Sequence, residues 1–333
     1  MSLAAAVRDG NRLALARLLS QVENATEEGM ASLNELFPYT GRAHLIGVTG
    51  APGTGKSSLV NQLALAYRRP AAGNDPKRVA IVAVDPSSPF SGGAILGDRV
   101  RMRDLSGDAG VFIRSMASRG SLGGLAAATA GLVQVFDAAG FEKIFIETVG
   151  AGQAEVDIAR LAHTTIVVEA PGLGDDIQAI KAGILEIADL LVINKADRPM
   201  VDSTERALRA MFDLTLSDFS HHHPGEMVAE TDLPRKPWQT PILRTVATEG
   251  MGIQAVYEAI EQHFNYLIES REWHIREQLR LQAELDTLIR QTLVNRWQAT
   301  ISSELYQSVL NDLVARRTSP HQALQILLDG EMK

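Results

Sequence analysis

Short apolar runs alternate with longer amphipathic stretches between His44 and about Ile260. Seven of these runs are rich in Val and Ile, which is typical of strands that helices cover on both faces. The predicted strands are residues 44 to 49, 78 to 84, 111 to 116, 143 to 148, 164 to 170, 189 to 194 and 240 to 246. The pattern therefore predicts an α/β fold, with a doubly wound and mostly parallel sheet.

The two ends of the chain follow helical spacing instead. Before Pro38, apolar residues recur at helical intervals, at Leu13, Leu15, Leu18, Leu19 and Val22. After about His263 the apolar stripe repeats every three or four residues, at Leu281, Leu285, Leu288, Ile289, Leu293 and Trp297. Ser319 and Pro320 are typical of the N-cap and first turn of a last helix.

These patterns predict three parts. They are an N-terminal helical extension (1–40), a central domain (41–262) and a C-terminal helical arm (263–333). A helical arm of this length needs an apolar partner, which is either the central domain or a second copy of the chain.

Composition and charge exclude several classes of protein. The chain has 333 residues and no cysteine, which excludes disulfides and thiolate zinc or redox sites. Its formal net charge of -8 argues against nucleic-acid binding. No segment approaches the roughly 20 apolar residues that cross a bilayer, and the N-terminal stretch lacks the apolar core of a signal peptide. We therefore expect a cytoplasmic protein with neither a membrane nor a nucleic acid as partner.

Residues 50 to 57, GAPGTGKS, match the phosphate-binding pattern G-x-x-x-x-G-K-[ST] between a predicted strand and a predicted helix. Glycines let the backbone N–H groups turn toward phosphates, and the helix N-terminus adds partial positive charge. We expect Lys56 to bridge phosphate oxygens and Ser57 to bind Mg²⁺. The predicted phosphate-binding residues are Gly50, Ala51, Pro52, Gly53, Thr54, Gly55, Lys56, Ser57 and Ser58.

The pattern N-K-x-D follows the sixth predicted strand, at residues 194 to 197. Guanine has two donors on one edge, and the Asp197 carboxylate can accept both, whereas adenine would leave it unpaired. We expect the Lys195 stem to line the base and Asn194 to tie this loop to the phosphate loop. A further contact to the base is expected from the backbone of Ala247, beside Val246, where serine is usual. The motifs predict GTP and GDP as ligands.

Acidic residues at the carboxyl ends of strands, or in the following loops, are candidates for binding Mg²⁺. Because Mg²⁺ prefers one or two carboxylates with water and phosphate oxygens, we predict a set of metal ligands: Ser57, Asp85, Asp98 and Glu147. Asp85 has an alternative role as a helix cap. Gly150 is expected to present its backbone N–H to the γ-phosphate.

Several strings resemble the MeaB/ArgK family, the methylmalonyl-CoA mutase-associated GTPases. They are GVTGAPGTGKSSL, VAVDPSSPFSGGAILGDRVRM, FIETVGAGQAEVDIA and GLGDDIQAIKAGILEIADLLVINKAD, and the likeness runs from about Leu13 to about residue 320. The resemblance implies a GTPase whose third motif has a glutamate, Glu147, and which is a chaperone of an adenosylcobalamin-dependent acyl-CoA mutase. GTP binding and hydrolysis would gate cofactor loading and protect the mutase. The resemblance also implies a homodimer formed through the C-terminal arm.

The resemblance further implies a mobile segment at residues 172 to 181. Gly172 and Gly174 flank an acidic loop that enters a helix, which favours mobility. If the segment folds over the nucleotide, Lys181 joins Lys56 and Glu147 as a catalytic residue; the alternative is a capped helix start. We expect slow intrinsic hydrolysis that a partner accelerates.

Two other functions remain open at this point. A nickel-type metallochaperone GTPase would share the fold and Glu147, but the chain lacks cysteine and a His-rich terminus. A kinase linked to basic amino-acid transport is disfavoured because Asp197 selects guanine. The polar insertion at residues 217 to 239 contains His221, His222 and His223, which could bind a metal but which we expect to be solvated.

Overall fold

The computed structural model describes residues 2–70, 75–86, 103–105, 107–118, 124–148, 154–172, 186–222 and 237–329. The chain divides into two compact units, Met1–Leu281 and Gln282–Lys333. The division falls within one long helix, α11 (Glu272–Thr300). The predicted start of the C-terminal arm at residue 263 lies in the preceding helix, α10 (Ile253–Glu269), which belongs to the first unit.

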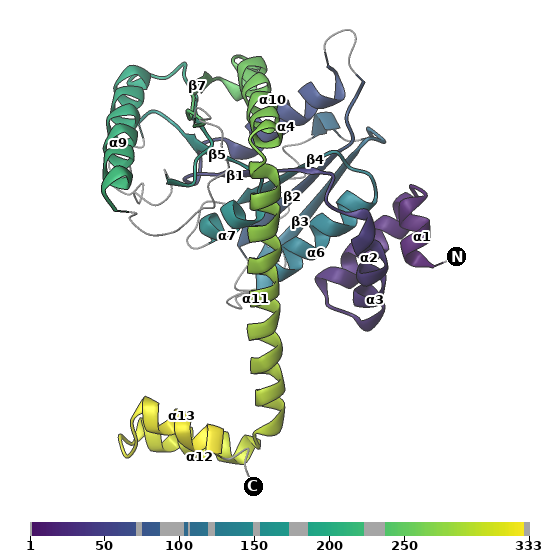
Figure 1. The fold of residues 1–333 in the computed structure, drawn as a ribbon, viewed down its shortest axis with the longest axis vertical. Helices are drawn as coiled ribbons and strands as arrows, with labels where there is room; N and C mark the ends of the chain where they lie inside the picture. Colours follow the sequence, from purple (N-terminus) through teal and green to yellow (C-terminus); the bar gives the residue numbers. More distant parts are fainter. Residues whose placement is uncertain are drawn as a thin grey trace. The chain divides into compact units, whose positions relative to one another are not determined.

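The first unit contains a sheet in which the seven described strands are all parallel (Figure 1). The strands are β1 (His44–Thr49), β2 (Val79–Pro86), β3 (Val111–Ser118), β4 (Lys143–Thr148), β5 (Thr164–Glu169), β6 (Leu190–Asn194) and β7 (Ile242–Thr245). Their order is β3-β2-β4-β1-β5-β6-β7, so β1 lies centrally between β4 and β5. The predicted strands and the fold class are confirmed.

Alternate residues of the central strands enter two separate cores, as the two-residue period of a strand requires. Ile46 of β1 packs with α4 (Lys56–Arg68) and α10 on one face of the sheet. Leu45 packs on the other face with α6 (Gly124–Ala138) and α7 (Ala154–Leu161). Helix α9 (Val201–His222) covers β6 through a smaller cluster that includes Leu208. Helices therefore cover both faces, as the apolar strands predicted (Figure 1).

The N-terminal segment is helical as predicted and packs on α6. It forms α1 (Leu3–Arg8), α2 (Arg12–Glu23), α3 (Glu27–Leu36) and a short 3₁₀ turn, η1 (Phe37–Tyr39). Leu15, Leu18, Leu19 and Val22 are buried, whereas Leu13 is 83% exposed. Leu13 is exposed because it lies two residues before Leu15, about 200° away around the helix.

The second unit consists of the rest of α11, α12 (Ser303–Val314) and α13 (Pro320–Asp329). Its core joins Val309, Ala323 and Leu327, with Trp297 packed against them. Helix α13 begins at Pro320, and the Ser319 hydroxyl accepts a hydrogen bond from Gln322 N at 3.3 Å, as the N-cap prediction requires. The large apolar side chains exposed on this part of α11 are Leu285, Leu288, Ile289, Leu293 and Val294.

The insertion predicted at residues 217 to 239 differs in part from a loop. Its first residues continue α9 as far as His222, while His223 lies outside the described residues. Its last residues are described, and Trp238 Nε1 donates to the Asp189 carbonyl oxygen at 2.9 Å.

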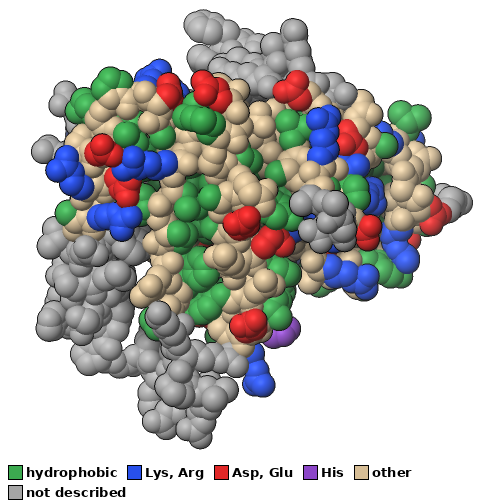
Figure 2. Space-filling model, turned by 90° about the horizontal axis from the view of Figure 1, so that it is seen from above, with side chains coloured by type: hydrophobic (Ala, Val, Ile, Leu, Met, Phe, Trp, Pro, Cys, Tyr) green, Lys and Arg blue, Asp and Glu red, His purple; other side chains and the backbone are tan. Residues whose placement is uncertain are grey.

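No helix in the described part of the chain is long and apolar enough to cross a membrane. On the face drawn in Figure 2, acidic and basic side chains of the described residues are interspersed.

Candidate nucleotide site

The phosphate loop follows β1 and contains three glycines with positive φ, Gly50 (+140°), Gly53 (+80°) and Gly55 (+94°). Two of them also lack room for a side chain. A Cβ on Gly50 would lie 2.1 Å from the carbonyl oxygen of Val168, and one on Gly55 would lie 2.3 Å from Asn194 Nδ2. Glycine is therefore required at these positions both by the backbone conformation and by close neighbours.

Lys56 begins α4 and its side chain curls back over the loop. Its Nζ donates to the carbonyl oxygens of Gly50 at 2.8 Å and Ala51 at 2.9 Å. The Thr54 hydroxyl donates to the same Ala51 oxygen at 3.0 Å. The buried ammonium thus lies within the loop whose backbone N–H groups are expected to face phosphates.

Ser57 and Glu147 meet at the carboxyl ends of β1 and β4. The register pairs Val48 with Glu147, so the start of the phosphate loop lies beside the end of β4. Ser57 Oγ donates to Glu147 Oε1 at 2.5 Å, and both residues are buried. A hydroxyl and a single carboxylate are oxygen donors of the kind that Mg²⁺ prefers, so the residues fit this cation. Asp85 lies at the end of β2, next to β4 at the same edge of the sheet.

Asn194 connects the base motif to two other loops. Its Nδ2 donates to the Thr54 carbonyl oxygen at 2.8 Å, which is the predicted tie to the phosphate loop. Its Oδ1 accepts from Thr245 Oγ1 at 3.1 Å and from Ala247 N at 3.0 Å. The Ala247 N–H, which the sequence assigned to the base, therefore donates to Asn194 here, at the start of the 3₁₀ turn η3 (Ala247–Glu249).

Lys195 and Asp197 lie on the turn that follows β6. Lys195 has a positive φ of 58°, and its Nζ donates to the Gly53 carbonyl oxygen at 2.5 Å. Its side chain therefore reaches the phosphate loop. Asp197 is exposed, and Ala196 N donates to the Thr245 carbonyl oxygen at 3.0 Å, which holds the turn in place.

The sequence of the chain matches a family model. The family described as methylmalonyl Co-A mutase-associated GTPase MeaB matches residues 15–302. The chain belongs to this family. A putative GTPase of Pyrococcus horikoshii is 40% identical over 97% of this chain and 95% of that protein, and GTPase ArgK of Escherichia coli is 34% identical over 86% and 81%.

Among solved structures, the MeaB-family chain is similar to one described as LAO/AO transport system kinase. The TM-score is 0.68 and the identity 26%, over 99% of this chain and 97% of that one. The fold and the predicted MeaB/ArgK resemblance are thereby confirmed. Because the matching family is one of GTPases and its relatives are named as GTPases, this MeaB-family chain is a P-loop GTPase that binds guanine nucleotide.

The structure brings the phosphate loop, Glu147 and the base motif to one edge of the sheet. Three other predicted residues of this MeaB-family site lie outside the described residues: Asp98, Gly150 and Lys181. Ser58 is half-buried on α4. Sequence reasoning missed the hydrogen bond that Thr245 Oγ1 donates to Asn194 Oδ1 at 3.1 Å, because threonine at this position belongs to no pattern that the sequence analysis used.

Proposed function

We propose that Mg²⁺·GTP binds where the phosphate loop, Glu147 and the base motif meet. The observation that carries this proposal is the position of Asn194. Its side chain bonds the Thr54 carbonyl of the phosphate loop at 2.8 Å and the Ala247 N–H at 3.0 Å, so one residue sets the distance between the phosphate-binding and base-binding loops. This arrangement suits a ligand with a phosphate chain at one end and a purine at the other.

In this proposal Lys56 and the backbone of Gly53 and Gly55 hold the phosphates. The ammonium offsets negative charge that develops on the phosphate oxygens. Ser57 and Glu147 would hold Mg²⁺, with Asp85 and Asp98 as further predicted ligands. When bound, the cation neutralises charge on the β- and γ-phosphate oxygens. Gly150 and Lys181 keep their predicted roles beside the γ-phosphate.

Selection of guanine by Asp197 is tested by Asp197→Asn. The new amide can donate to the extra carbonyl of xanthine but has one acceptor oxygen in place of two, so it cannot accept both donors of guanine, and preference should move from GTP to xanthosine triphosphate. We expect GTP affinity to fall at least about a hundredfold in titrations with fluorescent nucleotides. Asp202→Asn, an equivalent change at an exposed aspartate on α9, should leave affinity unchanged. If Asp197→Asn retains the GTP preference of the unmodified chain, the base pocket lies elsewhere.

We further propose that the chain is a chaperone of an adenosylcobalamin-dependent acyl-CoA mutase, gating cofactor loading by GTP hydrolysis. The family description and the family-like strings around the nucleotide site support this function. We also propose that the chain forms a homodimer through its C-terminal helices, whose exposed apolar side chains support a second copy as partner.

Mixing the purified chain with an adenosylcobalamin-dependent methylmalonyl-CoA mutase tests the chaperone function. We expect a stable complex and faster GTP hydrolysis than the chain shows alone. The Lys56→Ala variant, which should lose nucleotide binding, is the control for the hydrolysis signal. Absence of binding to methylmalonyl-CoA and isobutyryl-CoA mutases, with GDP as well as with a GTP analogue, would reject the chaperone function and leave the GTPase assignment intact.

A further inference from the structure

A buried polar network lies at the edge of the sheet opposite the nucleotide site. It includes the first residues of three adjacent strands, Lys143 of β4, His44 of β1 and Thr164 of β5, and Asp189, which immediately precedes β6. The carboxyl ends of β4, β1 and β6 carry the nucleotide motifs, Glu147, the phosphate loop and Asn194. The same strands therefore connect the network at one end to the nucleotide site at the other.

From Lys143 to His263, each side chain of the network donates a hydrogen bond to the next. Burial, reinforced by the charge of Lys143, lowers the pKa of His44 well below its ordinary value, so this imidazole is neutral. The Lys143 ammonium can only donate, and its Nζ lies 3.3 Å from His44 Nδ1. His44 Nε2 must then donate to Thr164 Oγ1 (2.6 Å), and the hydroxyl to His263 Nδ1 (2.8 Å). In the tautomer that this bond requires, the ring hydrogen of His263 is on Nε2, which lies 3.2 Å from Asp189 Oδ1.

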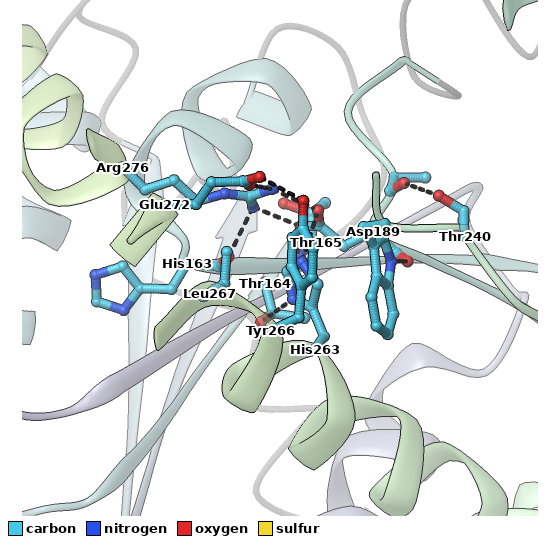
Figure 3. Close-up of polar contacts among 12 residues, drawn as sticks. His163, Thr164, Thr165, Asp189, Thr240, His263, Tyr266, Leu267, Glu272 and Arg276 are labelled. Carbon is cyan, nitrogen blue, oxygen red and sulfur yellow. Dashed lines mark hydrogen bonds and ion pairs between the residues drawn. The ribbon is translucent and has the colours of Figure 1, made fainter. Parts of the chain in front are cut away.

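The beginning of α11 supplies the opposite charges. Arg276 donates from both terminal nitrogens to the two Asp189 carboxylate oxygens, each at 2.8 Å, and also to the His163 carbonyl oxygen at 2.7 Å. Glu277 accepts from His163 Nε2 at 3.0 Å and from Arg280 at 2.6 Å. Figure 3 shows Arg276 of α11 and His263 of α10 converging on Asp189.

Such a network fixes the position of the first turns of α11 on the sheet more than it stabilises the folded protein. Buried ion pairs contribute little relative to apolar packing, but separating one leaves a buried charge without its partner. The paired bonds of Arg276 tolerate little displacement, because both depend on the orientation of the planar guanidinium. Asp189 also accepts from Thr165 N at 2.8 Å, which ties it to β5. A shift of the first turns of α11 must therefore either break these bonds or move the strands with it.

We propose that this network is a coupling joint: residues 272 to 281 of α11 and the guanine-nucleotide site bias each other's conformation through β1, β5 and β6, with Arg276 as a positioning residue. The inference rests on the nucleotide site proposed above. A partner that displaces these turns changes nucleotide affinity, and by linkage the bound nucleotide changes the partner's affinity by the same factor.

The variant Arg276→Met tests the joint. We expect the ratio of the affinities for a non-hydrolysable GTP analogue and GDP, measured by fluorescent-nucleotide titration, to change at least about fivefold. The hydrolysis rate kcat should change as well. Arg276→Lys should restore part of the effect, because an ammonium can still reach one carboxylate oxygen. Arg209→Met is the matched control, since Arg209 is paired with Glu205 on α9, away from the network.

Lower thermal stability of Arg276→Met with an unchanged affinity ratio and unchanged kcat would overturn the joint, because it would indicate a purely structural role. Should Arg276→Met fail to fold, hydrogen exchange of the unmodified chain decides the question. Amide exchange in residues 272 to 281 should differ at least about fivefold between the GDP and GTP-analogue complexes, and equal exchange would overturn the joint. An unmodified chain that binds no guanine nucleotide would instead remove the nucleotide site itself.

Discussion

Gly55 illustrates at the scale of one residue how closely the phosphate loop packs against the base motif. Its φ is +94°, and a Cβ would lie 2.3 Å from Asn194 Nδ2. Gly53 in the same loop has a similar φ of +80°, but nothing lies within 4 Å of its Cβ position. Alanine substitutions at the two glycines therefore distinguish the free-energy cost of a left-handed backbone from the cost of displacing Asn194.

We predict that Gly53→Ala destabilises the nucleotide-free protein by about 1 to 2 kcal/mol, the cost of a left-handed conformation for a residue with a Cβ. Gly55→Ala should cost about 1 to 3 kcal/mol more, because Asn194 must give up buried hydrogen bonds to Thr54 and Ala247. Urea unfolding of both variants measures the difference. Equal losses would show that Asn194 relaxes without losing these bonds.

At the scale of an element, α11 changes character along its length. Within the first unit, Trp273 and Arg280 are buried and Arg276 binds Asp189. Within the second unit, large apolar side chains are exposed, with Leu285 at 58% and Leu293 at 59%. Ile275 and Leu279 in the first part are exposed as well, so what distinguishes the first part is its buried Trp273 and Arg280 and its bonds to Asp189.

We predict that this apolar surface forms the proposed dimer. Replacing Leu288 and Leu293 together by glutamate places charges in the apolar contact, and the protein should sediment as a monomer in analytical ultracentrifugation. Leu13→Glu is the control, because Leu13 is also an exposed leucine but lies on α2. An unmodified chain that is monomeric at tens of micromolar would contradict the dimer.

At the scale of the whole molecule, the buried network makes stability depend on pH. Burial raises the pKa of Asp189, but the nearby His263 and the two hydrogen bonds from Arg276 outweigh this effect and lower the pKa from 3.8 to about 2. A carboxyl with a lower pKa in the folded state stabilises the protein above the unfolded pKa of 3.8, and this contribution is lost as the pH falls toward 2. The full contribution is about 2 kcal/mol.

We predict that about 1 kcal/mol of this contribution disappears between pH 6 and pH 3. Urea unfolding over this range should show the loss in the unmodified chain. Asp189→Asn is less stable at pH 6, since Arg276 loses its charged partner, but its difference from the unmodified chain should shrink as the pH falls. A difference that stays constant to pH 3 would mean that Asp189 titrates alike in the folded and unfolded states.

Local pattern was sufficient to predict much of the fold. The strands were identified because a strand buried on both faces has an apolar run through its middle, as Leu45 to Val48 of β1 and Ile144 to Ile146 of β4 show. The phosphate loop and the N-K-x-D turn were identified because their residues are contiguous, so their backbone geometry depends on neighbours in the sequence.

By itself, therefore, the sequence determined the elements, the guanine-nucleotide motifs and the family to which the chain belongs. Only the tertiary structure decided that Asn194 meets Thr245, that Ser57 donates directly to Glu147 at 2.5 Å, and that Arg276 meets Asp189. These partners are far apart in the chain. Their contacts depend on strand order and register, which arise from packing of the whole sheet and leave no periodic signal along the sequence.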